Sequence, residues 1–226
     1  MKRFSLFFIS IVLIILQWNL WSADNQLSSS EKSEGWVLLF NGIDHQGWKC
    51  NNGKPIAAPV EDGCLVPYKA GGYLIVHEKP FGDFKLRCEV RMEDPKTNSG
   101  VFFRVSDLNK PVQNGFEIQV YAESGTGYHH FGAIYDLCPS DADAAHPLGE
   151  WNQLEITSRG PLISVRLNGR EVSRINCDDF TKPGLRPDGS KHKFGVIKEL
   201  PRKGYLGFQD HGHKVWYKNV KILELD

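Results

Sequence analysis

The chain has 226 residues, with 27 lysines and arginines against 27 aspartates and glutamates, so its formal net charge is zero. This balance argues against binding to nucleic acid or to an anionic membrane, because both need an excess of basic side chains. Neutral ligands such as sugars fit the charge better than polyanions do.

The first 23 residues have the pattern of a secretory signal peptide. Lys2 and Arg3 precede an apolar run over residues 4–16, and the small residues Ser22 and Ala23 follow. The run is too short to cross a bilayer of roughly 30 Å comfortably. We therefore expect cleavage after Ala23 and export, with no membrane association afterwards.

Residues 24–35 are polar and rich in serine, which predicts a flexible leader. The remaining residues, 36–226, are enough for one well-filled domain. Their dominant hydrophobic period is two. Residues 83–93 show it most clearly, since apolar residues from Phe84 to Met92 alternate with charged ones.

Similar short runs recur about every ten residues, and none has the pattern of an amphipathic helix. We expect an all-β fold, a sandwich of two antiparallel sheets. The segment 178–203 is the exception, a long irregular excursion of the kind that is often functional or mobile. The expected strands are 36–40, 63–67, 73–76, 83–93, 100–105, 116–121, 132–135, 151–158, 162–167, 171–175, 204–209 and 215–223.

Five cysteines, all after residue 23, show no pair of CxxC motifs, so a structural zinc site is not expected. Export permits disulfides, and Cys50 with Cys64 is the expected bridge because the two flank one predicted hairpin. Cys88 lies on an apolar strand face and is expected to be buried.

Two neighbouring segments predict a polar face on the sheet. In 116–120, Glu117 and Gln119 point away from the apolar residues, and in 99–105, Phe102 and Arg104 do the same. If the strands pair, these four side chains form a platform for a polyhydroxylated ligand. An ordinary solvated sheet face is the alternative.

Two further clusters lie where strands end. Gln209 and His211 share a face, and an imidazole there can act as a general base or acid near neutral pH. His213 could reach the same side, but spacing indicates no third metal ligand, so we expect no cofactor, with a divalent cation left open. Tyr135 and Asp136 could reach the sheet rim or form a hydrogen-bonded corner.

Sandwich glycosidases often carry two catalytic carboxylates on one strand, as Glu-x-Asp-x-Glu. Here Glu117 is followed by Gln119 and then by Glu123, six residues on. This pattern disfavours the ordinary mechanism with two carboxylates.

Taken together, seven segments resemble the 3-keto-disaccharide hydrolase domain family, in order and over nearly all of residues 36–225. The resemblance implies a concanavalin A-like jelly roll, exported by a bacterium to the periplasm or beyond, that acts on oxidised glycosides. The segments are 39–42 with 47–48, 99–104, 117–120, 132–136, 149–152, 167–169 and 207–212.

By this resemblance, the expected function is cleavage of 3-keto-glycosides by removal of the C2 proton, elimination and hydration. His211 is the expected base, Glu117 would orient it or serve as the acid, and Tyr135 could donate to the keto oxygen. A carbohydrate-binding module and a conventional glycoside hydrolase are the alternatives. The expected substrate-binding residues are Arg104, Gln119, Asp136, Gln209, Phe102 and Trp48.

Overall fold

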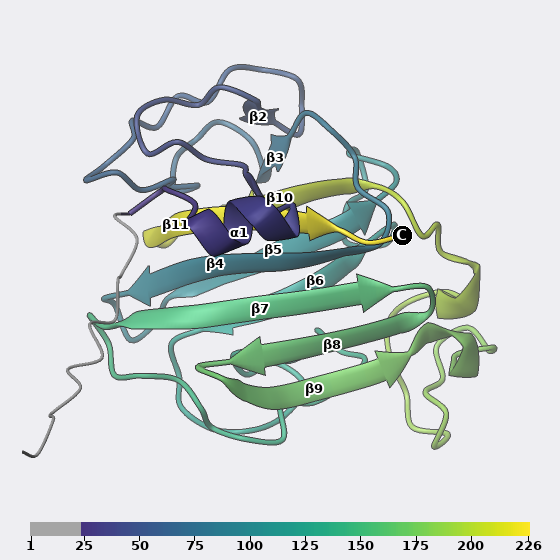
Figure 1. Ribbon diagram of the computed structural model, residues 1–226. Helices are drawn as coiled ribbons and strands as arrows, with labels where there is room; N and C mark the ends of the chain where they lie inside the picture. The colour runs from purple at the N-terminus through teal and green to yellow at the C-terminus, as the bar shows by residue number, and fades with distance from the viewer. Residues whose placement is uncertain (1–23) are drawn as a thin grey trace, which may run out of the picture.

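The computed structural model describes residues 24–226 as two antiparallel sheets packed face to face (Figure 1). The expected signal peptide lies outside the described residues. The all-β jelly-roll sandwich that the sequence predicts is confirmed. The first sheet, sheet A, has the order β1 (Val37–Leu38), β11 (Val215–Glu224), β4 (Phe84–Met92), β7 (Trp151–Arg159), β8 (Leu162–Leu167) and β9 (Arg170–Asn176). Sheet B has the order β2 (Trp48–Cys50), β3 (Leu74–His77), β10 (Tyr205–Gln209), β5 (Asn98–Val105) and β6 (Phe116–Tyr121).

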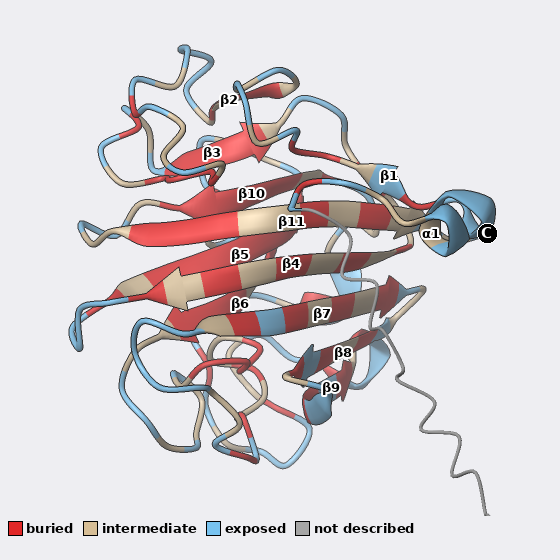
Figure 2. Ribbon diagram, turned by 60° about the vertical axis from the view of Figure 1, so that its left-hand side comes forward, coloured by how far each residue is buried: buried red, intermediate tan, exposed pale blue. Residues whose placement is uncertain are grey.

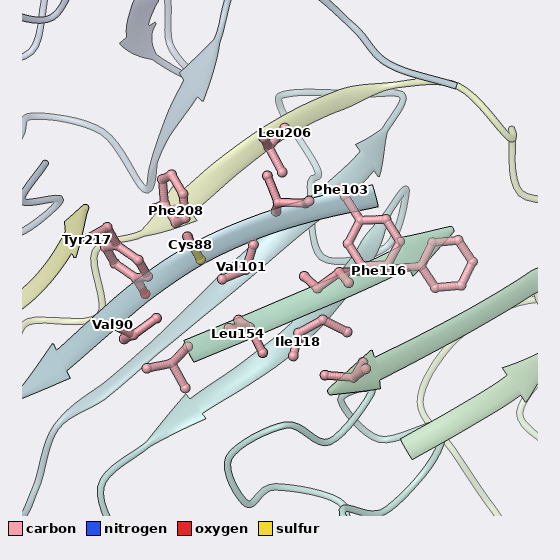
Figure 3. Packing of buried hydrophobic residues seen from close by; sticks show 14 of the residues in the cluster. Cys88, Val90, Val101, Phe103, Phe116, Ile118, Leu154, Leu206, Phe208 and Tyr217 are labelled. Atoms are coloured by element: carbon pink, nitrogen blue, oxygen red, sulfur yellow. The ribbon is translucent and has the colours of Figure 1, made fainter. Parts of the chain in front are cut away.

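The core lies between the sheets and follows from the period of two. Along β4, buried and half-buried residues alternate without interruption, which Figure 2 shows as stripes. Inward-facing residues of both sheets interdigitate (Figure 3), and the rings of Phe208 and Tyr217 lie 4.2 Å apart. Each large side chain buried here contributes roughly 1.5–3 kcal/mol, so this layer dominates the stability of the fold.

The expectation of a flexible leader is wrong. Helix α1 (Ser29–Glu34) begins with a capping box between Ser28 and Glu31, which satisfies two free backbone amides. Glu31 also pairs with Lys221 of β11, and the Nζ atom of Lys218 lies 2.9 Å from a carboxylate oxygen of Asp24. Figure 1 shows α1 lying beside β11. The folded unit therefore includes residues 24–35.

The sequence predicts that side chains of β5 alternate regularly between the two faces of the sheet, and this prediction is wrong after Phe103. Arg104 adopts a φ of 50°, and the pairing of β5 with β10 shifts at this point. Val101 and Phe103 join the main core, but Val105 joins Phe102 on the opposite face. The Arg104 guanidinium turns to the end of sheet A, where it donates to Asp83 Oδ1 (2.7 Å) and to the carbonyl of Gly160 (2.9 Å).

The expected bridge between Cys50 and Cys64 is also wrong, because all five cysteines, which lie within residues 24–226, are free. Cys50 is buried in the main core, and its thiol donates to the carbonyl of Ala70 at 3.2 Å. Cys64 packs in a separate apolar cluster with Val66 and Trp216. The predicted burial of Cys88 is confirmed.

Most expected strands are present, and the differences lie at the sheet edges. Segments 63–67 and 132–135 make only isolated bridges, and the short strand β2 was not expected. The excursion 178–203 starts in the turn η1 (Cys177–Asp179) and contains η2 (Ile197–Glu199), with Phe180 and Ile197 buried in the core. Over residues 24–226, we find no helix with the length and apolar character that spanning a bilayer requires.

Candidate active site

Polar side chains from six separate segments line a hollow of about 170 Å³ on the outer face of sheet B. Strands β5, β6 and β10 supply the floor, and loops and strand ends supply the walls. The lining residues are Tyr73, Asn98, Val112, Glu117, Gln119, Tyr135, Lys193, Gln209 and His211.

A larger hollow of about 330 Å³ lies on the outer face of sheet A, but several of its charged side chains are already paired. There Arg87 Nε donates to Glu155 Oε2 at 2.6 Å, and Lys221 is held by Glu31. A ligand would have to break these pairs. The hollow on sheet B is the better candidate, because its polar groups have unused bonding capacity.

Glu117 is the most unusual group in this hollow. Within residues 24–226, its carboxyl group makes no hydrogen bond or ion pair, although it is largely buried. Burial raises the pKa of Glu117 to about 8, and the nearby charge of Lys193 opposes this rise. The carboxyl group is therefore mostly protonated at neutral pH and can donate a proton.

Two buried amides flank Glu117 and are oriented by fixed partners. Gln119 Nε2 donates to Asn98 Oδ1 at 2.8 Å, and Gln209 Nε2 donates to the Tyr73 hydroxyl at 2.5 Å. The Ser99 hydroxyl holds the end of β10 by donating to the main-chain carbonyl of Gln209 at 2.7 Å. Gln209 Oε1 is buried with no donor in the described part of the chain, so it can accept a ligand hydroxyl.

The walls carry the groups that can handle charge. Lys193 Nζ lies 4.0 Å from the centre of the Tyr135 ring, and both residues line the hollow. His211 stands at the rim and is exposed. In residues 24–226, no group of three or more histidines, cysteines, aspartates or glutamates is arranged to hold a metal ion.

The structure brings Glu117, Gln119, Tyr135, Gln209 and His211 together, as the sequence predicted. It also adds Tyr73, Asn98 and Lys193, which sequence reasoning missed. The only signal for Lys193 was the irregular excursion in which it lies, and that signal identifies no single residue.

Four expected ligand contacts are wrong, and three of them are side chains buried for packing or ion pairing. Arg104 is fully buried against Asp83. Trp48 donates its ring N–H to the carbonyl of Leu39 and stacks on Phe208. Phe102 is buried on the outer face of sheet B, in an apolar cluster with Leu74 and Val76.

The fourth is Asp136, whose carboxylate is bonded within the protein. Asp136 Oδ1 accepts from Arg186 Nη2 at 2.9 Å, and Oδ2 accepts from the backbone amide of Lys193 at 2.8 Å. Asp136 therefore lies behind the wall of the hollow and does not line it.

Fold and site together define a β-sandwich protein with a polar hollow on the outer face of sheet B, lined by amides, a carboxyl group, an imidazole and an ammonium group. The family described as 3-keto-alpha-glucoside-1,2-lyase-like domain matches residues 35–223, and the chain belongs to this family. The resemblance seen in the sequence is thereby confirmed.

Relatives agree with this membership. The chain is 25% identical, over 86% of its length and 80% of the relative, to a protein of Bacteroides thetaiotaomicron named 3-keto-disaccharide hydrolase. It is also similar to two crystal structures from Parabacteroides distasonis, each provisionally assigned as a glycosyl hydrolase. One superposes with a TM-score of 0.73 at 29% identity, covering 90% of this chain and all of that one. The other has a TM-score of 0.69 at 28% identity, covering 84% and 99%.

Proposed function

We propose that this protein cleaves the glycosidic bond of 3-keto-glycosides, with a disaccharide oxidised at C3 as the model substrate. The observation that carries the proposal is the hollow itself, where an unpaired and protonated carboxyl group, an imidazole and an ammonium group converge. Membership of the 3-keto-alpha-glucoside-1,2-lyase-like family supports the substrate class.

The chemistry starts from the acidity of the C2 proton, which the neighbouring C3 ketone increases. A base removes this proton, and the electron pair moves into an enolate. The enolate then expels the C1 oxygen, which leaves as an alcohol and gives an enone. Water adds across the double bond, with its hydroxyl at C1 and a proton returned to C2, so the net reaction is hydrolysis.

His211 is the proposed base, because it stands exposed at the rim, where an imidazole can take and return a proton. Glu117 is the proposed acid for the departing oxygen, since its raised pKa keeps it protonated at neutral pH. The two roles are separate in this proposal, and both residues line the same hollow.

Lys193 and Tyr135 stabilise the negative charge that develops on the C3 oxygen in this proposal. An ammonium group and a phenolic hydroxyl in a partly enclosed site both favour an enolate. Gln119, Gln209 and Asn98 hold the sugar hydroxyls, because their amide groups are already oriented by partners. With residues 1–23 as a signal peptide, the activity would lie in the periplasm or outside the cell.

The direct test compares a disaccharide with its 3-keto form, in deuterated water, by NMR. We expect turnover of the 3-keto form only, with deuterium at C2 of the released 3-keto-glucose. His211→Ala should reduce this turnover by about 100-fold or more. Cleavage of the unoxidised sugar would indicate a conventional glycoside hydrolase, and binding without product would indicate a carbohydrate-binding module.

A further inference from the structure

A buried arginine, Arg186, links the excursion 178–203 to Asp136, behind the wall of the hollow. The Arg186 guanidinium is 8% exposed and lies 3.8 Å from the centre of the Tyr128 ring. Its Nη1 atom donates to the Ser190 hydroxyl and to the carbonyl of Lys191, so the excursion folds around it. Its Nη2 atom points outward from the excursion and donates to Asp136.

Asp136 joins the excursion at two places. One carboxylate oxygen accepts from Arg186, and the other accepts from the backbone amide of Lys193 at 2.8 Å. The main-chain carbonyl of Asp136 also accepts from Arg186 Nη2, at 2.6 Å. Asp136 has a φ of 57°, a conformation that aspartate tolerates better than most residues. These contacts fix the backbone of Lys193 relative to Tyr135, the residue next to Asp136.

The side chain of Lys193 has no comparable restraint of its own. Lys193 is exposed, and its Nζ atom makes no ion pair shorter than 4.0 Å with any residue of 24–226. It reaches the hollow by lying across the Tyr135 ring and, less closely, near Phe194 at 5.5 Å. Its position at the hollow therefore depends on where its backbone is held.

We propose that Asp136 and Arg186 form a strut that places the Lys193 ammonium group at the hollow, making both of them positioning residues for that cation. The role of Lys193 in turnover rests on the proposed function. The placement of Lys193 beside Glu117 does not, because it follows from contacts within the protein alone.

The effect of the strut on the position of Lys193 can be measured through the pKa of Glu117. Lys193 is the cation beside Glu117, and its charge lowers the pKa of that carboxyl group against the larger effect of burial. Tyr73, Tyr135 and His211 face the same hollow, and Tyr217 lies beneath it in the core. Loss of the ammonium group from the hollow should therefore raise the pKa of Glu117 further.

The experiment follows the side-chain carboxyl signal of Glu117 by carbon NMR without substrate, with Glu117→Gln used to assign it. Lys193→Met should raise the pKa, and Asp136→Asn should raise it in the same direction although it leaves the lysine in place. Asp178→Asn is the matched control, because it removes a similar pair with Arg202 (2.9 Å) on the same excursion and should leave the titration unchanged. Arg186→Lys, which keeps the charge but not the fork of donors, should act like Asp136→Asn.

Turnover of a 3-keto-disaccharide gives the second readout. Lys193→Met should lower kcat by about 100-fold, and Asp136→Asn by about 10-fold, whereas Lys193→Arg should recover part of the loss. A Glu117 titration that is the same in Asp136→Asn, Arg186→Lys and wild type would overturn the strut. If the titration moves as expected but no variant or wild type acts on 3-keto-glycosides, the strut stands and the proposed function fails.

Discussion

Glu117 lies directly over Gly100, so that a Cβ atom on residue 100 would come within 2.4 Å of Glu117 Oε1. Gly100 faces Gln119 across the pair β5–β6, and Glu117 faces Phe102 two residues further along. The φ of Gly100 lies outside the left-handed region, so the backbone conformation does not require glycine. The space above residue 100 does require it, because a Cβ atom there would clash with the Glu117 side chain. This gap lets the carboxyl group lie against the sheet, away from water, which is the cause of its raised pKa.

Gly100→Ala should therefore push the Glu117 carboxyl group outward. We expect the pKa of Glu117 to fall toward its ordinary value and kcat/KM on a 3-keto-disaccharide to fall by about 10-fold or more, because the acid is displaced. Gly82→Ala is the matched control, since a Cβ there meets no atom within 4 Å. Equal pH–rate profiles for Gly100→Ala and wild type would show that the contact has no role.

The pH dependence should report Glu117 as an acid. Because the pKa of Glu117 is about 8, the protonated acid is present below pH 8, and kcat/KM should decline as the pH rises through this value. Glu117→Gln should remove this decline together with most of the activity. A rate that rises through about pH 8 would instead assign Glu117 as the base.

The leaving group separates the two roles further. An aryl 3-keto-glucoside releases a phenolate, which needs little protonation, so Glu117→Gln should lose far less activity on it than on a 3-keto-disaccharide. His211→Ala should lose similar activity on both substrates, because removal of the C2 proton does not depend on the leaving group. Equal losses for Glu117→Gln on the two substrates would contradict the acid role.

Glu117 should also make the fold less stable at alkaline pH. A carboxyl group whose pKa is raised in the folded state favours folding while it is protonated. That contribution is lost as pH rises from the ordinary pKa of 4.5 to about 8. Urea unfolding should show that the stability of Glu117→Gln increases relative to wild type across this window, and the difference should reach on the order of 5 kcal/mol above it. Glu150→Gln, which changes an exposed carboxyl group, should show no such gain.

Sequence periodicity predicted the floor of the site well, and the reason is geometrical. Glu117 and Gln119 lie two positions apart on a regular strand, so a period of two puts both on the outer face. Gln209 lies one position after the core residue Phe208, and the same rule places it correctly. Pairing of β5 with β6 then brings Asn98 to Gln119, since residues near in the chain form this hairpin.

The walls could not be predicted by the same rule. Arg104 has a left-handed backbone conformation inside a strand, which arginine rarely adopts. This conformation moves the side chains that follow it to the opposite face of the sheet from the one that alternation predicts. Lys193 lies in a segment with no period, and Asp136, which fixes its backbone, is 57 residues away in the chain. Trp48 could have stacked on a sugar or on Phe208, and only the packing of β2 against the core decides between these.

The corrected position of Arg104 gives a final prediction about stability. Its buried guanidinium is held by Asp83, whose second oxygen accepts from the backbone amide of Gly160 at 2.7 Å. Arg104→Met leaves Asp83 without its cation and should cost about 3 kcal/mol in the free energy of unfolding, measured in urea. Asp83→Asn should cost a similar amount, because it leaves a buried cation unpaired.

Activity separates this structural role from the substrate contact that the sequence suggested. The guanidinium ends at Asp83 and Gly160, away from the residues that line the hollow. Arg104→Met should therefore keep KM for a 3-keto-disaccharide within about twofold, measured well below its unfolding temperature on the folded fraction. A stable Arg104→Met protein with KM raised by 10-fold or more would show that Arg104 contacts the substrate, since a lost substrate hydrogen bond costs on the order of 1 kcal/mol or more.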